Sequence, residues 1–232
     1  SLKNKWKLNT GASYSTNKDD ITFGMQNAVK QDVALDILKF FKNFTLANRG
    51  EYFNAKIVLE KKFKGLNAIR FGSEYNYSKD KNTFTAFNGQ KLVTNIKENI
   101  NSVFAESDIY LTNNLAAKFG ARVEKSSLLD KTNIAPRVSL AYKLGKQSQA
   151  SLAYGIFYQN PELRNLPGLV PLTFQKATHY IAQYLKTTSL QTFRVEAFYK
   201  KYDDLIKSSF INNQNIASSN NGFGDAKGFE LF

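Results

Sequence analysis

Residues 115–124 read Leu-Ala-Ala-Lys-Phe-Gly-Ala-Arg-Val-Glu, and this stretch decides the fold class. Its odd-numbered positions carry only apolar side chains: Leu115, Ala117, Phe119, Ala121 and Val123. Its even-numbered positions carry Ala116 and then Lys118, Gly120, Arg122 and Glu124. Because successive side chains of a β-strand point to opposite faces, the stretch predicts a strand with one apolar and one polar face.

The same alternation recurs along the chain. It is clear in five further stretches: 6–14, 69–77, 137–144, 149–158 (where Phe157 breaks the rule) and 193–200. It is weaker in four more: 51–60, 100–111, 174–185 and 224–232. About ten strands result, several of them near ten residues, the length of a tilted strand that crosses a membrane. The fold class that this predicts is all-β.

The connections between these strands alternate in length. Short turns are expected at 64–65, 112–114, 145–147 and 187–189, and long polar loops at 79–97, 126–133, 160–173 and 208–224. This predicts an antiparallel up-and-down meander with one decorated end. A further long loop is expected at about residues 16–48. Apolar residues at helical spacing from Val29 to Phe44 predict one short amphipathic helix in it, with an irregular loop as the alternative.

Composition excludes several classes of protein. The chain has 232 residues, a formal charge of +13, 42% hydrophobic and 14% aromatic residues, a mixture that argues against disorder. No apolar run reaches the roughly 18 residues of a transmembrane helix. With no Cys and one His, we expect no disulfide, metal, nucleotide or covalent cofactor. The lysines are scattered, which predicts a solvated surface and no nucleic-acid partner.

A strand with two unlike faces fits two architectures. In a soluble sandwich the apolar face points into a core, whereas in a membrane barrel it points to lipid. Tyrosines near strand ends favour the barrel, as do polar faces of mixed charge, such as Arg70 with Glu74 and Arg194 with Glu196. A soluble all-β binding module or adhesin is the alternative, and a β-scaffold hydrolase is disfavoured. The single histidine, His179, lacks a catalytic constellation, so a structural or lumen-lining role is expected.

Seven blocks in this order resemble a known family. They are 103–111 (Val-Phe-Ala-Glu-Ser-Asp-Ile-Tyr-Leu), 117–124 (Ala-Lys-Phe-Gly-Ala-Arg-Val-Glu), 134–140 (Ile-Ala-Pro-Arg-Val-Ser-Leu), 152–161 (Leu-Ala-Tyr-Gly-Ile-Phe-Tyr-Gln-Asn-Pro), 176–180 (Lys-Ala-Thr-His-Tyr), 194–202 (Arg-Val-Glu-Ala-Phe-Tyr-Lys-Lys-Tyr) and 224–231 (Gly-Asp-Ala-Lys-Gly-Phe-Glu-Leu). Between Glu51 and Phe232 the chain resembles the barrel portion of TonB-dependent outer-membrane receptors, most closely the Bacteroidetes type. That family builds a 22-stranded barrel closed by an N-terminal plug.

The resemblance implies that residues 1–232 form a partial β-barrel domain, with the plug domain absent. The sequence begins at Ser1-Leu2 without Met and stops inside an expected strand, so we expect a fragment of a longer chain. The edges of such a fragment are expected to self-associate.

The function implied by the resemblance is non-enzymatic uptake of a nutrient across the bacterial outer membrane. The ligand would be a siderophore, glycan, peptide or vitamin, and the partners would be outer-membrane lipid or lipopolysaccharide and, through the plug, the TonB energy-transducing complex. No catalytic residue and no metal ligand is expected. We expect eight charged residues to line the lumen: Arg70, Glu74, Lys118, Arg122, Glu124, Arg137, Arg194 and Glu196.

Overall fold

The computed structural model describes residues 6–31, 43–161, 172–211 and 214–232. All of its regular elements are strands, and the described residues contain no helix. The strands are β1 (Trp6–Phe23), β2 (Phe44–Lys62), β3 (Ala68–Ala86), β4 (Lys91–Tyr110), β5 (Leu115–Ser126), β6 (Lys131–Lys143), β7 (Ser148–Gln159), β8 (Gln175–Thr187), β9 (Thr192–Ile211) and β10 (Gln214–Leu231). The predicted all-β class is confirmed.

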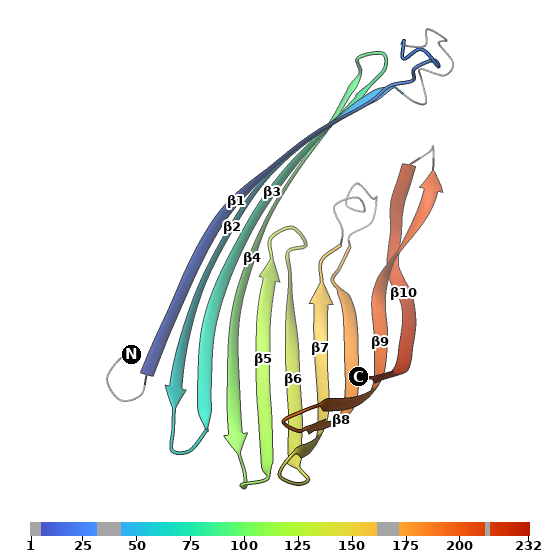
Figure 1. The fold of residues 1–232 in the computed structure, drawn as a ribbon. Coiled ribbons are helices and arrows are strands. Elements are labelled where there is room, and N and C mark those ends of the chain that lie inside the picture. Colours follow the sequence, from blue (N-terminus) through green and yellow to red (C-terminus); the bar gives the residue numbers. More distant parts are fainter. Residues whose placement is uncertain (1–5, 32–42, 162–171, 212–213) are drawn as a thin grey trace. The chain divides into compact units, whose positions relative to one another are not determined.

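The strands form a single ten-stranded sheet in sequence order, from β1 to β10 (Figure 1). The pairs from β5 to β10 are antiparallel and each strand pairs with the next along the chain, so the predicted up-and-down meander is also confirmed. Register is continuous from β5 to β9. It shifts between β9 and β10 around Gly222, close to Asp204, whose φ of 58° lies in the left-handed region.

The chain divides into two compact units, which are described separately. The first contains Ser1–Thr10, Lys56–Glu74 and Asn101–Phe232, and the second contains Gly11–Ala55 and Tyr75–Ile100. Strands β5 to β10 therefore belong wholly to the first unit. Strands β1 to β4 contribute one segment to each unit.

The predicted lengths of several long loops are wrong, because strands continue through the residues expected to form them. The loop expected at 16–48 is shorter, since β1 continues to Phe23 and β2 begins at Phe44. In the same way β3 and β4 occupy most of 79–97, and β9 and β10 occupy most of 208–224. Beyond Tyr14, β1 continues as Ser-Thr-Asn-Lys-Asp-Asp-Ile-Thr-Phe, and in this part the alternation that predicts a strand is missing.

The predicted helix lies mostly at residues 32–42, outside the described residues. Its first residue, Val29, belongs to a turn in which the Lys30 amide donates to the Asn27 carbonyl at 3.0 Å. Its last residue, Phe44, begins β2. There its ring stacks on Phe23 at 4.6 Å and meets Phe84 at 5.4 Å, contacts made within the second unit.

One face of the first unit is apolar and uncovered. The register places Val138 beside both Phe119 and Tyr154, and Leu140 beside Leu152. Tyrosine rings continue across the next strands on this face, at 5.2 Å from Tyr154 to Tyr180 and 6.1 Å from there to Tyr199. Leu152 is 60% exposed and Phe229 83% exposed, so no described part of the chain packs over this face.

Candidate functional site

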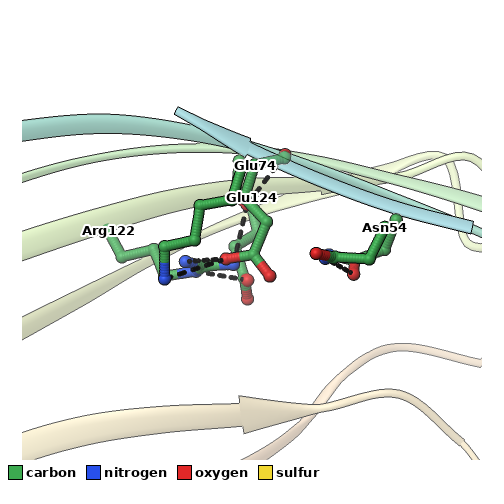
Figure 2. Close-up of polar contacts among 7 residues, drawn as sticks. Asn54, Glu74, Arg122 and Glu124 are labelled. Carbon is green, nitrogen blue, oxygen red and sulfur yellow. Dashed lines mark hydrogen bonds and ion pairs between the residues drawn. The ribbon is translucent and has the colours of Figure 1, made fainter. Parts of the chain in front are cut away.

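The opposite face of the first unit is polar, and Arg122 makes the most polar contacts on it. Its Nε donates to the Glu124 carboxylate at 2.6 Å, and its Nη1 to Glu74 at 3.1 Å. Its Nη2 donates to the Ser102 hydroxyl at 2.7 Å, which in turn donates to the Glu74 backbone carbonyl at 3.2 Å. Figure 2 shows the guanidinium lying beside both carboxylates. A fork that three strands share in this way fixes the side chain in one orientation.

A second charged cluster surrounds Arg70 on β3. Its Nε donates to Glu60 at 2.7 Å and its Nη1 to Asp108 at 2.8 Å. The ammonium of Lys118 lies 3.4 Å from the other oxygen of Asp108. Arg70 therefore bridges carboxylates of its two neighbouring strands, β2 and β4, whereas Arg122 joins a carboxylate of its own strand to one on β3. Both charges are compensated within the wall of the sheet.

Aromatic rings lie over glycines on this polar face. A Cβ added to Gly72 would fall 2.2 Å from the ring of Phe104, and one added to Gly155 would fall 3.0 Å from the ring of Phe157. Gly228 and Phe198 form a third such pair, at 2.9 Å. Sequence reasoning missed this pattern, although Phe157 was visible as a break in the alternation.

Cations stack on the same rings. The Arg122 guanidinium lies 5.9 Å and the Lys56 ammonium 5.4 Å from the centroid of Phe104. Arg137 lies 4.7 Å from the centroid of Phe157. Such cation–π contacts hold a positive charge in place without a carboxylate. They explain why aromatic side chains are present on a face that is otherwise charged.

The eight predicted lumen residues all belong to the first unit, and the structure brings five of them into the two clusters. Those five are Arg70, Glu74, Lys118, Arg122 and Glu124. The other three, Arg137, Arg194 and Glu196, lie outside these clusters. The Arg137 guanidinium stacks on the Phe157 ring, and the Arg194 guanidinium lies 4.0 Å from the ring centroid of Phe232. Glu196 accepts a hydrogen bond from the Gln183 side-chain amide at 3.0 Å.

The polar face of the first unit is hollowed at two places. One cavity of about 310 Å³ is lined by Glu106, Lys118, Ser139, Phe157 and His179, together with Arg137. A second cavity of about 340 Å³ includes the side chains of Lys56, Arg70, Phe104, Arg122 and Arg137. At the second cavity Lys56, Arg70 and Arg122 are already paired with carboxylates. Arg137 lines both cavities and has no carboxylate partner among the described residues, so it is the cation suited to holding an anionic group.

The described residues offer neither a metal centre nor a membrane-spanning helix. In the part of the chain that the structure describes, no group of three or more His, Asp or Glu residues is placed to hold a metal ion. No helix of sufficient length and hydropathy to cross a membrane occurs among the described residues.

Comparison with known proteins identifies a family. A family model described as "TonB dependent receptor-like, beta-barrel" matches residues 1–232, the whole chain. No curated protein sequence matches it.

Three similar solved structures show how far the likeness extends. They are the ferric enterobactin receptor PfeA of Pseudomonas aeruginosa (TM-score 0.72, 14% identity, 97% of this chain and 38% of that one), the pyoverdine-bound FpvA of P. aeruginosa (0.75, 12%, 100% and 36%) and the alcaligin outer-membrane receptor FauA of Bordetella pertussis (0.70, 14%, 99% and 40%). At these identities the likeness concerns the fold. The chain spans about two fifths of the length of each of these proteins.

Proposed function

Because the chain belongs to the TonB dependent receptor-like β-barrel family, we propose that it is the barrel segment of a transporter that takes up a siderophore-type ligand. Barrels of this family lie in the outer membrane of Gram-negative bacteria, and the family's members are transporters and not enzymes. We propose the same for this chain: binding and passage of a ligand, with no bond chemistry. Family membership leaves no support for the soluble-module alternative.

The observation that carries the proposal is the sharp difference between the two faces of the first unit. Large apolar side chains such as Leu152 and Phe229 are exposed on one face, where lipid would cover them. On the other face arginines are paired with carboxylates or stacked on rings. We infer that this polar face lines the lumen and that the eight predicted charged residues form part of its wall.

The lumen residues would serve two purposes. The paired residues, such as Arg122 on β5 with Glu74 on β3, would hold strands of the sheet together and present a nearly neutral wall. Cations without a carboxylate partner, such as Arg137, would attract an anionic ligand. Siderophore-type uptake is favoured because the similar receptors PfeA, FpvA and FauA are described with enterobactin, pyoverdine and alcaligin.

The partners follow from the same proposal. Energy would come from the TonB complex through a plug domain, and the apolar face would contact outer-membrane lipid, including lipopolysaccharide. The Bacteroidetes-type origin suggested by the sequence belongs to the proposal as well.

The test is an uptake measurement in the bacterium that carries the gene. Deleting the receptor gene should abolish uptake of radiolabelled iron supplied as a ferric siderophore complex. A plasmid copy of the gene should restore this uptake, but not in a strain that also lacks TonB. Uptake of labelled vitamin B12 serves as the control and should not change. If iron uptake is unaffected by the deletion while B12, glycan or peptide uptake falls, the siderophore assignment is wrong.

A further inference from the structure

We propose that the 310 Å³ cavity beside Arg137, Phe157 and His179 binds a planar aromatic anion, such as an aryl carboxylate. This inference deepens the proposed function and rests on it in one respect, because a transported ligand would meet the cavity only if the polar face lines the lumen. The binding chemistry itself follows from the geometry of β6, β7 and β8 in the first unit.

The cavity is built around a glycine. In the register of the sheet, Gly155 on β7 lies between Arg137 on β6 and His179 on β8. Because Gly155 has no side chain, the Phe157 ring folds over it, within 3.0 Å of where a Cβ would be. The ring centroid lies 4.7 Å from the Arg137 guanidinium and 4.7 Å from the centroid of the His179 ring. One aromatic ring is thus held between two nitrogen-rich groups.

Arg137 differs from Arg70 and Arg122 in its charge compensation. The guanidinium N–H groups of Arg70 and of Arg122 each pair with two carboxylates. Among the described residues, no carboxylate lies within 4.0 Å of the Arg137 guanidinium, and the side chain is exposed. Its planar fork of N–H donors is therefore available to an incoming anion, and a carboxylate fits that fork with two parallel hydrogen bonds.

The remaining lining residues agree with an anionic, ring-bearing ligand. Lys118 and the hydroxyl of Ser139 supply further donors, and Lys200 lies opposite His179 in the register. The partly exposed rings of Phe157 and His179 line the cavity and supply aromatic contact area for a ring-bearing ligand. Glu106 is the one carboxylate lining the cavity, and its side chain lies across Gly120, with Cγ 3.1 Å from where a Cβ would be. It bounds the end of the cavity nearest β4, so the anionic group is expected at the β6–β8 end.

The experiment measures binding of benzoate to the full-length receptor in detergent micelles by saturation-transfer difference NMR. We expect saturable binding to the wild type. Arg137→Gln should weaken it roughly tenfold or more, the loss expected for a charge-assisted hydrogen bond. Phe157→Leu should weaken it severalfold through lost stacking. The matched control is Arg49→Gln, because Arg49 is an exposed arginine of the second unit that pairs with Asp20 and does not line this cavity. That variant should bind as the wild type does.

Two results would overturn the inference: no saturable binding of benzoate to the wild-type receptor, or equal affinity for the wild type and Arg137→Gln. Heat-modifiable migration on gels verifies that each variant is folded. The uptake measurement and the benzoate-binding measurement can succeed or fail independently. Benzoate binding that depends on Arg137, in a receptor that does not import iron, supports the cavity proposal and refutes the transport proposal. Iron import by a receptor without such binding supports the transport proposal and refutes the cavity proposal.

Discussion

Arg122 is the residue on which the polar wall depends most. Its guanidinium joins Glu74, Glu124 and Ser102 and is only 22% exposed at the side chain. Replacing it with Ala removes the guanidinium from two half-buried carboxylates, of which Glu74 keeps the ammonium of Lys56 at 3.8 Å. The expected loss is about 1–3 kcal/mol of unfolding free energy, the range for hydrogen bonds to charged groups. Urea unfolding of the receptor in lipid vesicles measures it.

Lys118→Ala is the matched control for that substitution. The Lys118 side chain is 65% exposed and makes a single ion pair at 3.4 Å, so the change should cost well under about 1 kcal/mol. Equal losses for Arg122→Ala and Lys118→Ala would mean that the Arg122 network contributes nothing beyond an ordinary surface ion pair.

Gly72 is the second residue whose replacement should be costly. An added Cβ would fall 2.2 Å from the tip of the Phe104 ring, so the ring must leave its place and give up its contact with Arg122. Gly72→Ala should destabilise the barrel by about 1–3 kcal/mol, as overpacking does. Gly11→Ala, with nothing within 4 Å, should be neutral or slightly stabilising in the same urea unfolding experiment. The opposite order of the two variants would disprove the steric argument.

At the scale of the strand, alternation makes a prediction that the absence of cysteine allows to be tested cleanly. Ser151 and Leu152 are neighbours on β7 and point to opposite faces. In the receptor in outer-membrane vesicles, Ser151→Cys should react with a water-soluble, charged thiol reagent. Leu152→Cys should react only with a lipid-soluble maleimide. If both cysteines react with the charged reagent, the apolar face does not lie against lipid.

The strands also show what the sequence could and could not predict. Alternation located all ten strands because in each of them some part separates an apolar from a polar face, as Phe119 and Arg122 do on β5. It missed the outer parts of β1 to β4, such as Lys18 to Ile21 on β1. Those parts are held by backbone pairing and by ion pairs such as Arg49 with Asp20 at 2.6 Å. Hydrogen bonds of the backbone leave no mark on the pattern of side chains.

The sequence predicted the charged residues of the candidate site but not all of their partners. Charged residues on one face were evident, and five of the eight meet in the two clusters. Their partners were not all evident, because Ser102, Glu60 and Asp108 come from strands whose registers the sequence does not specify. The stacking of Phe157 over Gly155 was out of reach for a related reason. It depends on Arg137 and His179 lying on either side of that glycine in the folded sheet.

At the scale of the whole chain, the strand order begins at β1 and ends at β10, and within the described residues neither strand has a second neighbour. A strand with a free edge exposes backbone donors and acceptors and recruits other strands. We therefore expect the 232-residue chain, folded by itself in detergent, to associate edge to edge. Light scattering should report a mass of two or more chains.

Cysteines placed on the two terminal strands distinguish association from closure. Leu8 lies on β1 and Phe229 on β10, so a Leu8→Cys, Phe229→Cys chain carries one thiol near each free edge. A barrel closes only when strand number, tilt and shear agree. If the ten strands are part of a larger barrel, as we propose, they should not bring these edges together. Mild oxidation should then produce disulfide-linked dimers and longer species, whereas each single-cysteine chain should stop at dimers. A disulfide formed within one chain, in a particle with the mass of a monomer, would show that the sheet closes on itself and would contradict the prediction.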